Sequence, residues 1–190
     1  RRRRPPTVGA MLNWRVAATP DNEAIRYPDA QENWVSLTWA QMRQVVWEVG
    51  AGLLAIGLQP EERVAIASNT RYEWVLLDLA INCAGGATTT VYPNTTGPEF
   101  AHIITHSESK YFVAENVEQL EKLRELVPGD QIREVILLDG TAEGTISKEM
   151  LREKGRALLA ENPSAMDDAV AATTPDTLAT LIYTSGTTGL

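Results

Sequence analysis

The residues best suited to chemistry lie at the end of the chain, where an apolar run is followed by small polar residues. Residues 178–183 are apolar enough for a strand, and residues 184–189 are all Gly, Ser or Thr. Glycine lets a bulky anion approach the backbone, successive N–H groups form an anion-binding nest, and hydroxyls donate to phosphate oxygens. We therefore predict a nucleotide-phosphate loop made of Thr184, Ser185, Gly186, Thr187, Thr188 and Gly189.

A segment of this composition is also typical of a flexible linker. Two observations favour the phosphate loop. The segment directly follows a strand-like run, which is where phosphate loops lie in α/β folds. Its order, Tyr-Thr-Ser-Gly-Thr-Thr-Gly over residues 183–189, is specific. It matches neither the Walker A pattern nor G-x-G-x-x-G, so those two kinds of nucleotide site are excluded at this position.

The elements that must position this loop alternate between strand and helix from residue 63 onward. Alternating strands and helices predict a mainly parallel sheet with right-handed crossovers and helices on its faces. In such sheets ligands bind at the carboxyl ends of strands, which is where the loop begins. The strand-like runs are residues 63–68, 87–92, 110–114, 134–138 and 178–183, and a polar connector, residues 162–177, precedes the last one.

The first 57 residues predict an additional helix, a small hairpin and a long helix. Thr7 is placed to cap the first helix, and the strand-like residues 24–27 and 34–37 predict the hairpin. Thr38 and Gln41 form a capping box for the long helix, which ends at Gly57. The fold class is therefore α/β, with a mainly parallel sheet flanked by helices and preceded by a helix and a hairpin.

Three features of the predicted helices lead to further predictions. Gly50 and Gly52 interrupt the long helix, and because glycine is unfavourable there, we expect close packing against another element. The pairs Thr70 with Glu73 and Thr96 with Glu99 predict two more capping boxes. Cys83 lies in an apolar helical pattern, so we expect it to be buried and unreactive.

Other candidate sites have simpler interpretations. Glu99, His102 and His106 share one helix face, but their order does not fit the metalloprotease pattern, and solvated or capping histidines are expected rather than a metal site. Residues 92–96 are typical of a turn and a helix cap, with a role in bordering the loop's crevice as the alternative. The five Trp residues are expected in or over the core, because they lack the interleaved basic residues of single-strand nucleic-acid binders.

Length and charge limit the function classes. The chain has 190 residues, enough for one domain with a core, and a net charge of −8, which disfavours nucleic acid as a partner. No apolar run reaches the about 18 residues of a membrane span, and no signal peptide is found, so a cytoplasmic location is expected. Residues 1–6, which begin with four arginines, are expected to be flexible. A peripheral membrane contact through those arginines is the alternative.

The motif at residues 183–189 resembles the signature phosphate loop of the adenylate-forming superfamily, which includes acyl-CoA synthetases, luciferases and non-ribosomal peptide adenylation domains. Upstream segments are similar to the N-terminal blocks of that superfamily, in the right order. Within it, residues 91–115 are most similar to bacterial long-chain fatty acyl-CoA synthetases. The upstream blocks are L-T-W-A-Q-M (37–42), A-G-L-L-A-I-G-L (51–58), E-R-V-A-I (62–66), Glu73-Trp74 and G-A-T-T-T-V-Y-P (86–93).

The resemblance implies a reaction of two steps. A fatty acid carboxylate attacks the α-phosphate of ATP to give acyl-AMP and pyrophosphate, and the thiol of coenzyme A then displaces AMP. The resemblance implies that residues 184–189 hold the β- and γ-phosphates and that Thr184 contacts Mg²⁺. It implies small-molecule partners (fatty acid, ATP and CoA) and leaves open whether the protein is a homodimer.

The superfamily pattern continues with Pro-Lys-Gly, and the chain ends at Leu190, before that lysine. We therefore expect residues 7–190 to be the N-terminal part of the AMP-binding large domain, with no catalytic residue in this stretch and no full reaction by the stretch alone. Two alternatives stay open. One is a non-catalytic nucleotide-binding or scaffold module, and the other is an adenylating enzyme for another carboxylic acid.

Overall fold

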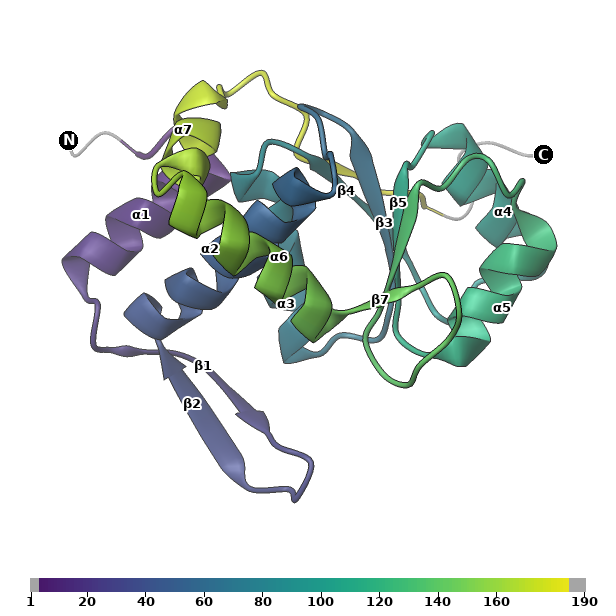
Figure 1. Cartoon of the computed structure of the whole chain (residues 1–190), viewed down its shortest axis with the longest axis horizontal. Helices are drawn as coiled ribbons and strands as arrows, with labels where there is room; N and C mark the ends of the chain where they lie inside the picture. Colours follow the sequence, from purple (N-terminus) through teal and green to yellow (C-terminus); the bar gives the residue numbers. More distant parts are fainter. Residues whose placement is uncertain (1–3, 185–190) are drawn as a thin grey trace.

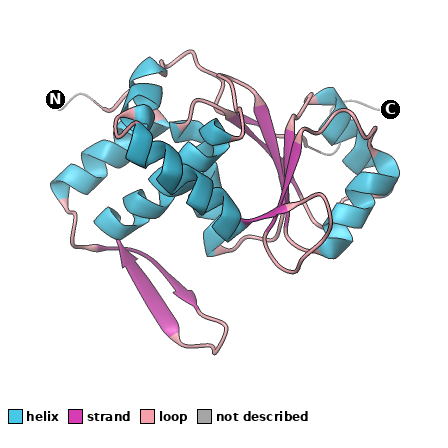
Figure 2. Ribbon diagram, in the orientation of Figure 1, coloured by secondary structure: helices cyan, strands magenta, loops and turns pink. Residues whose placement is uncertain are grey.

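The computed structural model describes residues 4–184. Within them a six-stranded sheet has the order β7-β6-β5-β3-β4-β8, with all its neighbouring strands parallel, and a separate antiparallel pair is formed by β1 and β2. Helices cover both faces of the six-stranded sheet (Figure 1; Figure 2). The predicted α/β class, with a parallel sheet preceded by a helix and a hairpin, is confirmed.

The N-terminal part forms as its local sequence predicts. Helix α1 (Val8–Ala18) begins where the Thr7 hydroxyl accepts a hydrogen bond from the backbone N–H of Ala10 at 3.2 Å. Strands β1 (Glu23–Pro28) and β2 (Trp34–Thr38) form the hairpin, which projects from the body of the molecule (Figure 1). Tyr27 of the hairpin stacks on Tyr72 of α3 (Tyr72–Cys83) with ring centroids 3.7 Å apart.

Helix α2 (Trp39–Ala55) has both hydrogen bonds of the predicted capping box, between Thr38 and Gln41. It ends at Ala55 with Ile56 as its C-cap, and the next residue, Gly57, has a φ of +98°, a conformation that glycine adopts readily. The prediction of close packing at its glycines is also confirmed. A β-carbon on Gly52 would lie 2.2 Å from the carbonyl oxygen of Leu151 in α6 (Lys148–Glu161).

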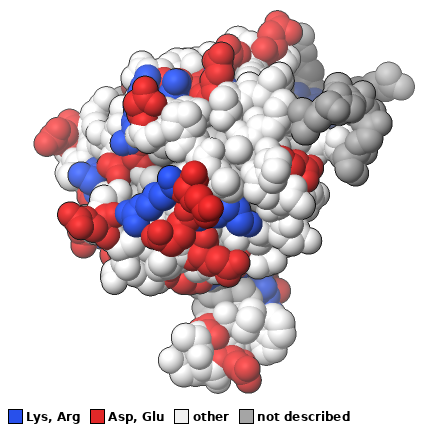
Figure 3. Space-filling model, turned by 90° about the vertical axis from the view of Figure 1, so that its right-hand side faces the viewer, with Lys and Arg blue, Asp and Glu red and all other residues white. Residues whose placement is uncertain are grey.

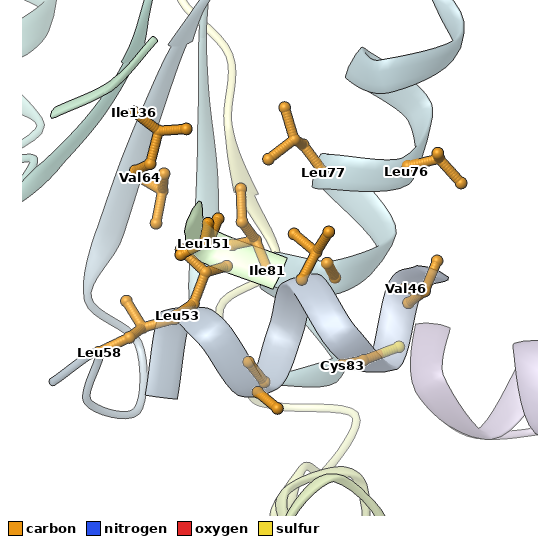
Figure 4. Close-up of a cluster of buried hydrophobic side chains, with 14 of the residues drawn as sticks. Val46, Leu53, Leu58, Val64, Leu76, Leu77, Ile81, Cys83, Ile136 and Leu151 are labelled. Carbon is orange, nitrogen blue, oxygen red and sulfur yellow. The ribbon is translucent and has the colours of Figure 1, made fainter. Parts of the chain in front are cut away.

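Each face of the sheet buries its own apolar cluster, because side chains alternate along each strand. In β3 (Arg63–Ala67), Val64 and Ile66 face α2, α3 and α6, the cluster drawn in Figure 4. Ala65 and Ala67 face α4 (Gly97–His106) and α5 (Val117–Leu126) on the other side. The remaining elements are β4 (Ala87–Val91), β5 (Tyr111–Ala114), β6 (Glu134–Leu137), β7 (Ile146–Ser147), α7 (Ala165–Ala172) and β8 (Thr180–Leu181).

The segment before the last strand differs from the prediction. Residues 162–177 contain helix α7 instead of being an irregular connector throughout. Two of its apolar side chains explain the helix: Met166 and Val170 are buried, and they lie against Gly50 and Gly9 of neighbouring helices. The short strand β7 was also not expected, and β8 pairs over Thr180–Leu181 only, which is shorter than residues 178–183.

Two predicted capping boxes are wrong. Helix α3 has Arg71 at its N-cap with no side-chain cap bond, because the carboxylate of Glu73 instead accepts bonds from Arg71 and Lys148. Thr96 does occupy the N-cap of α4, but its side chain makes no cap bond. By contrast, the side chains of Asn116 and Ser147 do accept cap bonds at the starts of α5 and α6.

The tryptophans and the cysteine have mixed outcomes. Trp47 is buried, whereas Trp14 and Trp34 are 50% and 71% exposed, so the expectation of core or cover positions is wrong for these two. Cys83 is fully buried, and burial raises the pKa of its thiol to about 12. The thiol is therefore protonated at neutral pH, as expected of a buried, unreactive cysteine.

The surface carries both signs of charge. On the face drawn in Figure 3, acidic and basic side chains adjoin one another near the centre, and acidic ones also lie along the margins. The ion pairs of the described residues include Glu121 with Arg124 on α5, at 3.0 Å. Of the helices within residues 4–184, none combines the length and the apolar character needed to cross a bilayer.

Candidate functional site

The strand order creates a divergence at the carboxyl ends of β3 and β4. These two strands are neighbours, yet the helices that follow them pack on opposite faces of the sheet, α3 with the cluster around α2 and α4 with the cluster around α5. The connections therefore separate above the sheet edge. In parallel α/β sheets, such a switch point is where ligands bind.

A cavity of about 630 Å³ lies at this switch point. Its wall is formed by the residues that follow β3, β4 and β8, together with part of α3. Of the described residues that line it, none is charged; they offer hydroxyls, amides and aromatic rings. They are Ser68, Asn69, Thr70, Trp74, Val75, Thr90, Tyr92, Pro93, Asn94, Ile182 and Tyr183.

The predicted phosphate loop begins at this cavity. Ile182 and Tyr183 line it, and Thr184, which is exposed, follows directly. The rest of the predicted loop, Ser185, Gly186, Thr187, Thr188 and Gly189, lies outside the described residues. The position of its first residue at the carboxyl edge of the sheet agrees with the expectation from the strand and helix order.

Residues 92–96 contribute to the site as well as forming a turn. Tyr92, Pro93 and Asn94 line the cavity together with Ile182 and Tyr183, so this segment borders the same cavity as the residues that precede the predicted loop. Two side chains of α5 hold the segment by its carbonyl groups. Lys122 donates to the carbonyl oxygens of Pro93 at 2.9 Å and Thr95 at 3.4 Å, and Gln119 donates to Pro93 at 3.2 Å.

The start of α3 is held beside the cavity by a buried carboxylate. Glu73, whose side chain is 8% exposed, accepts bonds from Arg71 at 2.7 and 2.8 Å and from Lys148 at 2.9 Å. Burial opposes the ionisation of Glu73, but these bonds outweigh it and lower its pKa to about 2. Its partner Arg71 also bonds Asp139, which follows β6. This charge network connects the ends of two strands to the helix that carries Trp74.

The end of β8 is connected to α4 through Tyr183. Its hydroxyl oxygen lies 2.9 Å from Nδ1 of His106. The Tyr183 ring also meets the rings of His102 and His106 edge to face, with centroids 6.1 and 5.8 Å apart. His102 and His106 stack on each other at 5.1 Å. Within residues 4–184 no group of three or more His, Cys, Asp or Glu side chains has an arrangement that could hold a metal ion.

The sequence interpretation missed several members of this site. Trp74 lines the cavity from the first turn of α3, and Thr90 lines it from near the end of β4. At both positions the local pattern indicates only burial. Ser68, Asn69 and Thr70 carried a usable signal, since polar residues directly after a buried strand lie at the edge where ligands bind. The contact of His106 with Tyr183 joins residues 77 positions apart and has no local signal.

Comparison with known proteins agrees with this geometry. Residues 12–190 match the family described as AMP-binding enzyme. The chain is 33% identical over 159 residues to the long-chain-fatty-acid–CoA ligase FadD15 of Mycobacterium bovis, a match that covers 82% of the chain and 25% of that protein. It is 28% identical over 160 residues to fatty acyl-CoA synthetase A of Dictyostelium discoideum, covering 82% of the chain and 23% of that protein.

A solved structure shows the same fold. The apo structure of MbtA from Mycobacterium smegmatis superimposes with a TM-score of 0.71 at 18% identity, covering 97% of the chain and 32% of that protein. The chain thus spans about a quarter of the length of the two curated relatives.

Proposed function

The chain belongs to the AMP-binding enzyme family, and on this premise we propose that it is the N-terminal part of an ATP-dependent, AMP-forming ligase that joins a long-chain fatty acid to coenzyme A. In the first step the carboxylate attacks the α-phosphate of ATP, its bond to phosphorus forms, and pyrophosphate leaves. In the second step the thiol of coenzyme A attacks the acyl carbon, and AMP leaves. Pyrophosphate is the leaving group of the first step, and AMP is the leaving group of the second.

The observation that carries this proposal is the position of Tyr183 and Thr184, which follow β8 by two and three residues. They emerge at the carboxyl edge of the sheet, beside the cavity of about 630 Å³ between the ends of β3, β4 and β8. A loop of glycines and hydroxyl residues that starts there is suited to bind phosphate oxygens. The proposed contribution of Thr184, Ser185, Gly186, Thr187, Thr188 and Gly189 is to hold the β- and γ-phosphates and stabilise the charge that develops on the leaving group.

The residues at this edge fit a magnesium-bound nucleotide. The side chain of Thr184 is exposed at the end of β8, and a hydroxyl oxygen is a ligand that this hard cation accepts. When bound, Mg²⁺ would neutralise phosphate charge. The hydroxyls and amides that line the cavity, such as those of Thr70 and Asn94, are neutral donors to phosphate and sugar oxygens.

The division of the chain follows from the same proposal. We propose that residues 7–190 form the N-terminal part of the large AMP-binding domain, preceded by the basic residues 1–6, of which the first three lie outside the described residues. Since the chain spans 25% of the length of its Mycobacterium bovis relative, further residues of such a ligase would complete the adenine and acyl sites. A cytoplasmic location, a peripheral membrane contact and a homodimer stay predictions.

The acid substrate is the finer part of the proposal. The support for a long-chain fatty acid is the 33% identity to a protein named as a long-chain-fatty-acid–CoA ligase. Two interpretations compete with it. One is a ligase for amino acids or aryl acids, and the other is a non-catalytic nucleotide-binding module.

ATP–pyrophosphate exchange by the full-length protein that carries this chain tests these interpretations together. The panel contains C12–C18 fatty acids, amino acids and aryl acids, each with Mg²⁺ and without it. We expect exchange with the fatty acids. Exchange with another acid class only would overturn the substrate proposal, and the absence of exchange with every acid would overturn the ligase in favour of the module.

A further inference from the structure

The predicted phosphate loop has little side-chain mass of its own. Its six residues are Gly, Ser or Thr, so its position depends on how the polypeptide is held on either side. Before the loop, little of the backbone is restrained by the sheet, because β8 pairs with β4 only at Thr180 and Leu181. The next large side chain before the loop is Tyr183, which Thr184 follows directly.

Tyr183 is held by a helix that is itself firmly packed. Its hydroxyl lies 2.9 Å from Nδ1 of His106, and the ring planes of the two residues are nearly perpendicular, at 87°. Both histidines lie on α4. That helix is anchored on its other side by Phe100, Ile103 and Ile104, which are 0%, 4% and 0% exposed.

We propose that His106 is a positioning residue for the phosphate loop, acting through the hydroxyl of Tyr183. The inference rests on the proposed function, because it concerns the loop that binds the phosphates of ATP. His106 contacts neither nucleotide nor reacting atoms in this role. It fixes the direction of the Tyr183 side chain and, with it, the position of the backbone at which Thr184 begins the predicted loop.

The hydrogen bond has a function that the ring contacts alone do not supply. The edge-to-face contacts with His102 and His106 place the Tyr183 ring beside α4 but do not involve its hydroxyl. The bond to Nδ1 selects one position, whichever of the two groups donates the proton. Small displacements of a group that binds the reacting substrate can change rates by about 10²-fold, so such a restraint matters at the start of the loop.

A double-mutant cycle in the full-length protein tests this proposal, with ATP–pyrophosphate exchange as the readout. Tyr183→Phe removes only the hydroxyl, and His106→Phe removes the ring nitrogen while keeping an aromatic ring. His106→Asn offers an oxygen and a nitrogen near the place of Nδ1 and is the conservative rescue. Thr105→Ala, at an exposed neighbour on the same helix, is the matched control.

We expect each Phe variant to lower kcat/KM for ATP by about three- to tenfold, the effect of losing one hydrogen bond of ordinary strength. The double variant should be no worse than either single one, because both remove the same bond. KM for the fatty acid should stay unchanged, His106→Asn should recover most of the loss, and Thr105→Ala should match wild type.

Three results would overturn the inference. They are additive losses in the cycle, a Tyr183→Phe variant with wild-type kcat/KM for ATP, or an equal rise in KM for the fatty acid, which indicates a general loss of structure. A wild-type protein that shows no exchange with any acid would instead overturn the proposed function, and this inference with it. The two kinds of failure are therefore distinguishable by the wild-type measurement.

Discussion

Gly155 of α6 lies directly against the backbone of Glu48 in α2, so that a β-carbon at Gly155 would be only 1.8 Å from the Glu48 carbonyl oxygen. The carboxylate of the same Glu48 bonds Arg152 and Arg156, which flank the glycine on α6, at 2.7 and 3.3 Å. One residue of α2 therefore contacts α6 through both its backbone and its side chain. The contact allows these two helices to pack closely over the same face of the sheet.

Replacing Gly155 by Ala should destabilise the fold by about 3 kcal/mol, the upper part of the range for overpacking a close contact. Helix propensity alone predicts the opposite, a gain of about 1 kcal/mol for Ala over Gly in a helix. Urea unfolding of the 190-residue chain measures the difference. Gly129→Ala is the matched control, because no atom lies within 4 Å of a β-carbon there. A Gly155→Ala chain as stable as wild type would show that α2 and α6 are not in backbone contact.

Glu73→Gln should reveal a pH-dependent contribution to stability. The pKa of Glu73 is lowered from 4.5 to about 2 in the fold, where bonds from Arg71 and Lys148 outweigh the effect of burial. The folded state thus binds this proton more weakly than the unfolded state. The stabilisation is complete above pH 4.5, the ordinary value, and is lost as the pH falls toward 2.

The size of the effect is set by the pKa shift and by solvent. We expect Glu73→Gln to lower the free energy of unfolding by about 2 kcal/mol at pH 7, after allowance for screening of the exposed partner Lys148. The difference from wild type should shrink between pH 4.5 and pH 2. Urea titrations across this range measure it, with the exposed Glu153→Gln as control. A difference that stays constant with pH would contradict the assignment.

Lys122→Met tests whether the hydrogen bonds from Lys122 of α5 keep residues 92–96 in place at the cavity wall. The substitution keeps the length of the side chain but removes the donor to the carbonyl oxygens of Pro93 and Thr95. We expect a loss of about 1–2 kcal/mol in stability, as for a charged hydrogen bond, with faster amide hydrogen exchange in residues 92–96. Lys154→Met, at an exposed position on α6, is the control. Unchanged amide hydrogen exchange in residues 92–96 would contradict this role of Lys122.

Thr184→Val should separate the hydroxyl from the shape of the first loop residue. Valine has nearly the same volume but no oxygen, whereas Thr184→Ser keeps the hydroxyl. In the full-length protein we expect Thr184→Val to lower the rate of ATP–pyrophosphate exchange by about tenfold or more and to raise the Mg²⁺ concentration needed, because a ligand or donor of the phosphate site is lost. Thr184→Ser should stay close to wild type. Equal exchange rates for Thr184→Val and Thr184→Ser would show that the reaction does not need the Thr184 hydroxyl.

The 190-residue chain on its own should not form acyl-CoA from fatty acid, ATP and coenzyme A. It spans 25% of the length of its Mycobacterium bovis relative, and the proposed phosphate loop accounts for only one part of the reaction. Mass spectrometry for the thioester, with the full-length protein as positive control, measures this. Acyl-CoA produced by the purified chain would show that the active site is complete within it.

Local features of this protein could be predicted from its sequence because they depend on residues a few positions apart. The caps at Thr7 and Thr38 each join a side chain to a backbone group three residues away. The alternation of strands and helices, and hence the parallel sheet, follows from hydrophobic periodicity within each segment. The composition and order of residues 184–189, directly after a strand-like run, predict a phosphate loop at a strand end.

Contacts between distant residues decided the rest. Arg71 and Lys148 draw Glu73 away from the expected capping box, and the burial of Met166 explains a helix in an expected connector.

The sequence by itself thus determined most of the elements, though not α7 or β7, and the position of the predicted loop along the chain. Only the tertiary structure decided the strand order, in which β3 separates β4 from β5, and so placed the cavity where neighbouring strands send their helices to opposite faces. It also decided the contact of His106 with Tyr183 across 77 positions. The physical reason is that strand order and side-chain pairing depend on packing between segments, which no local pattern encodes.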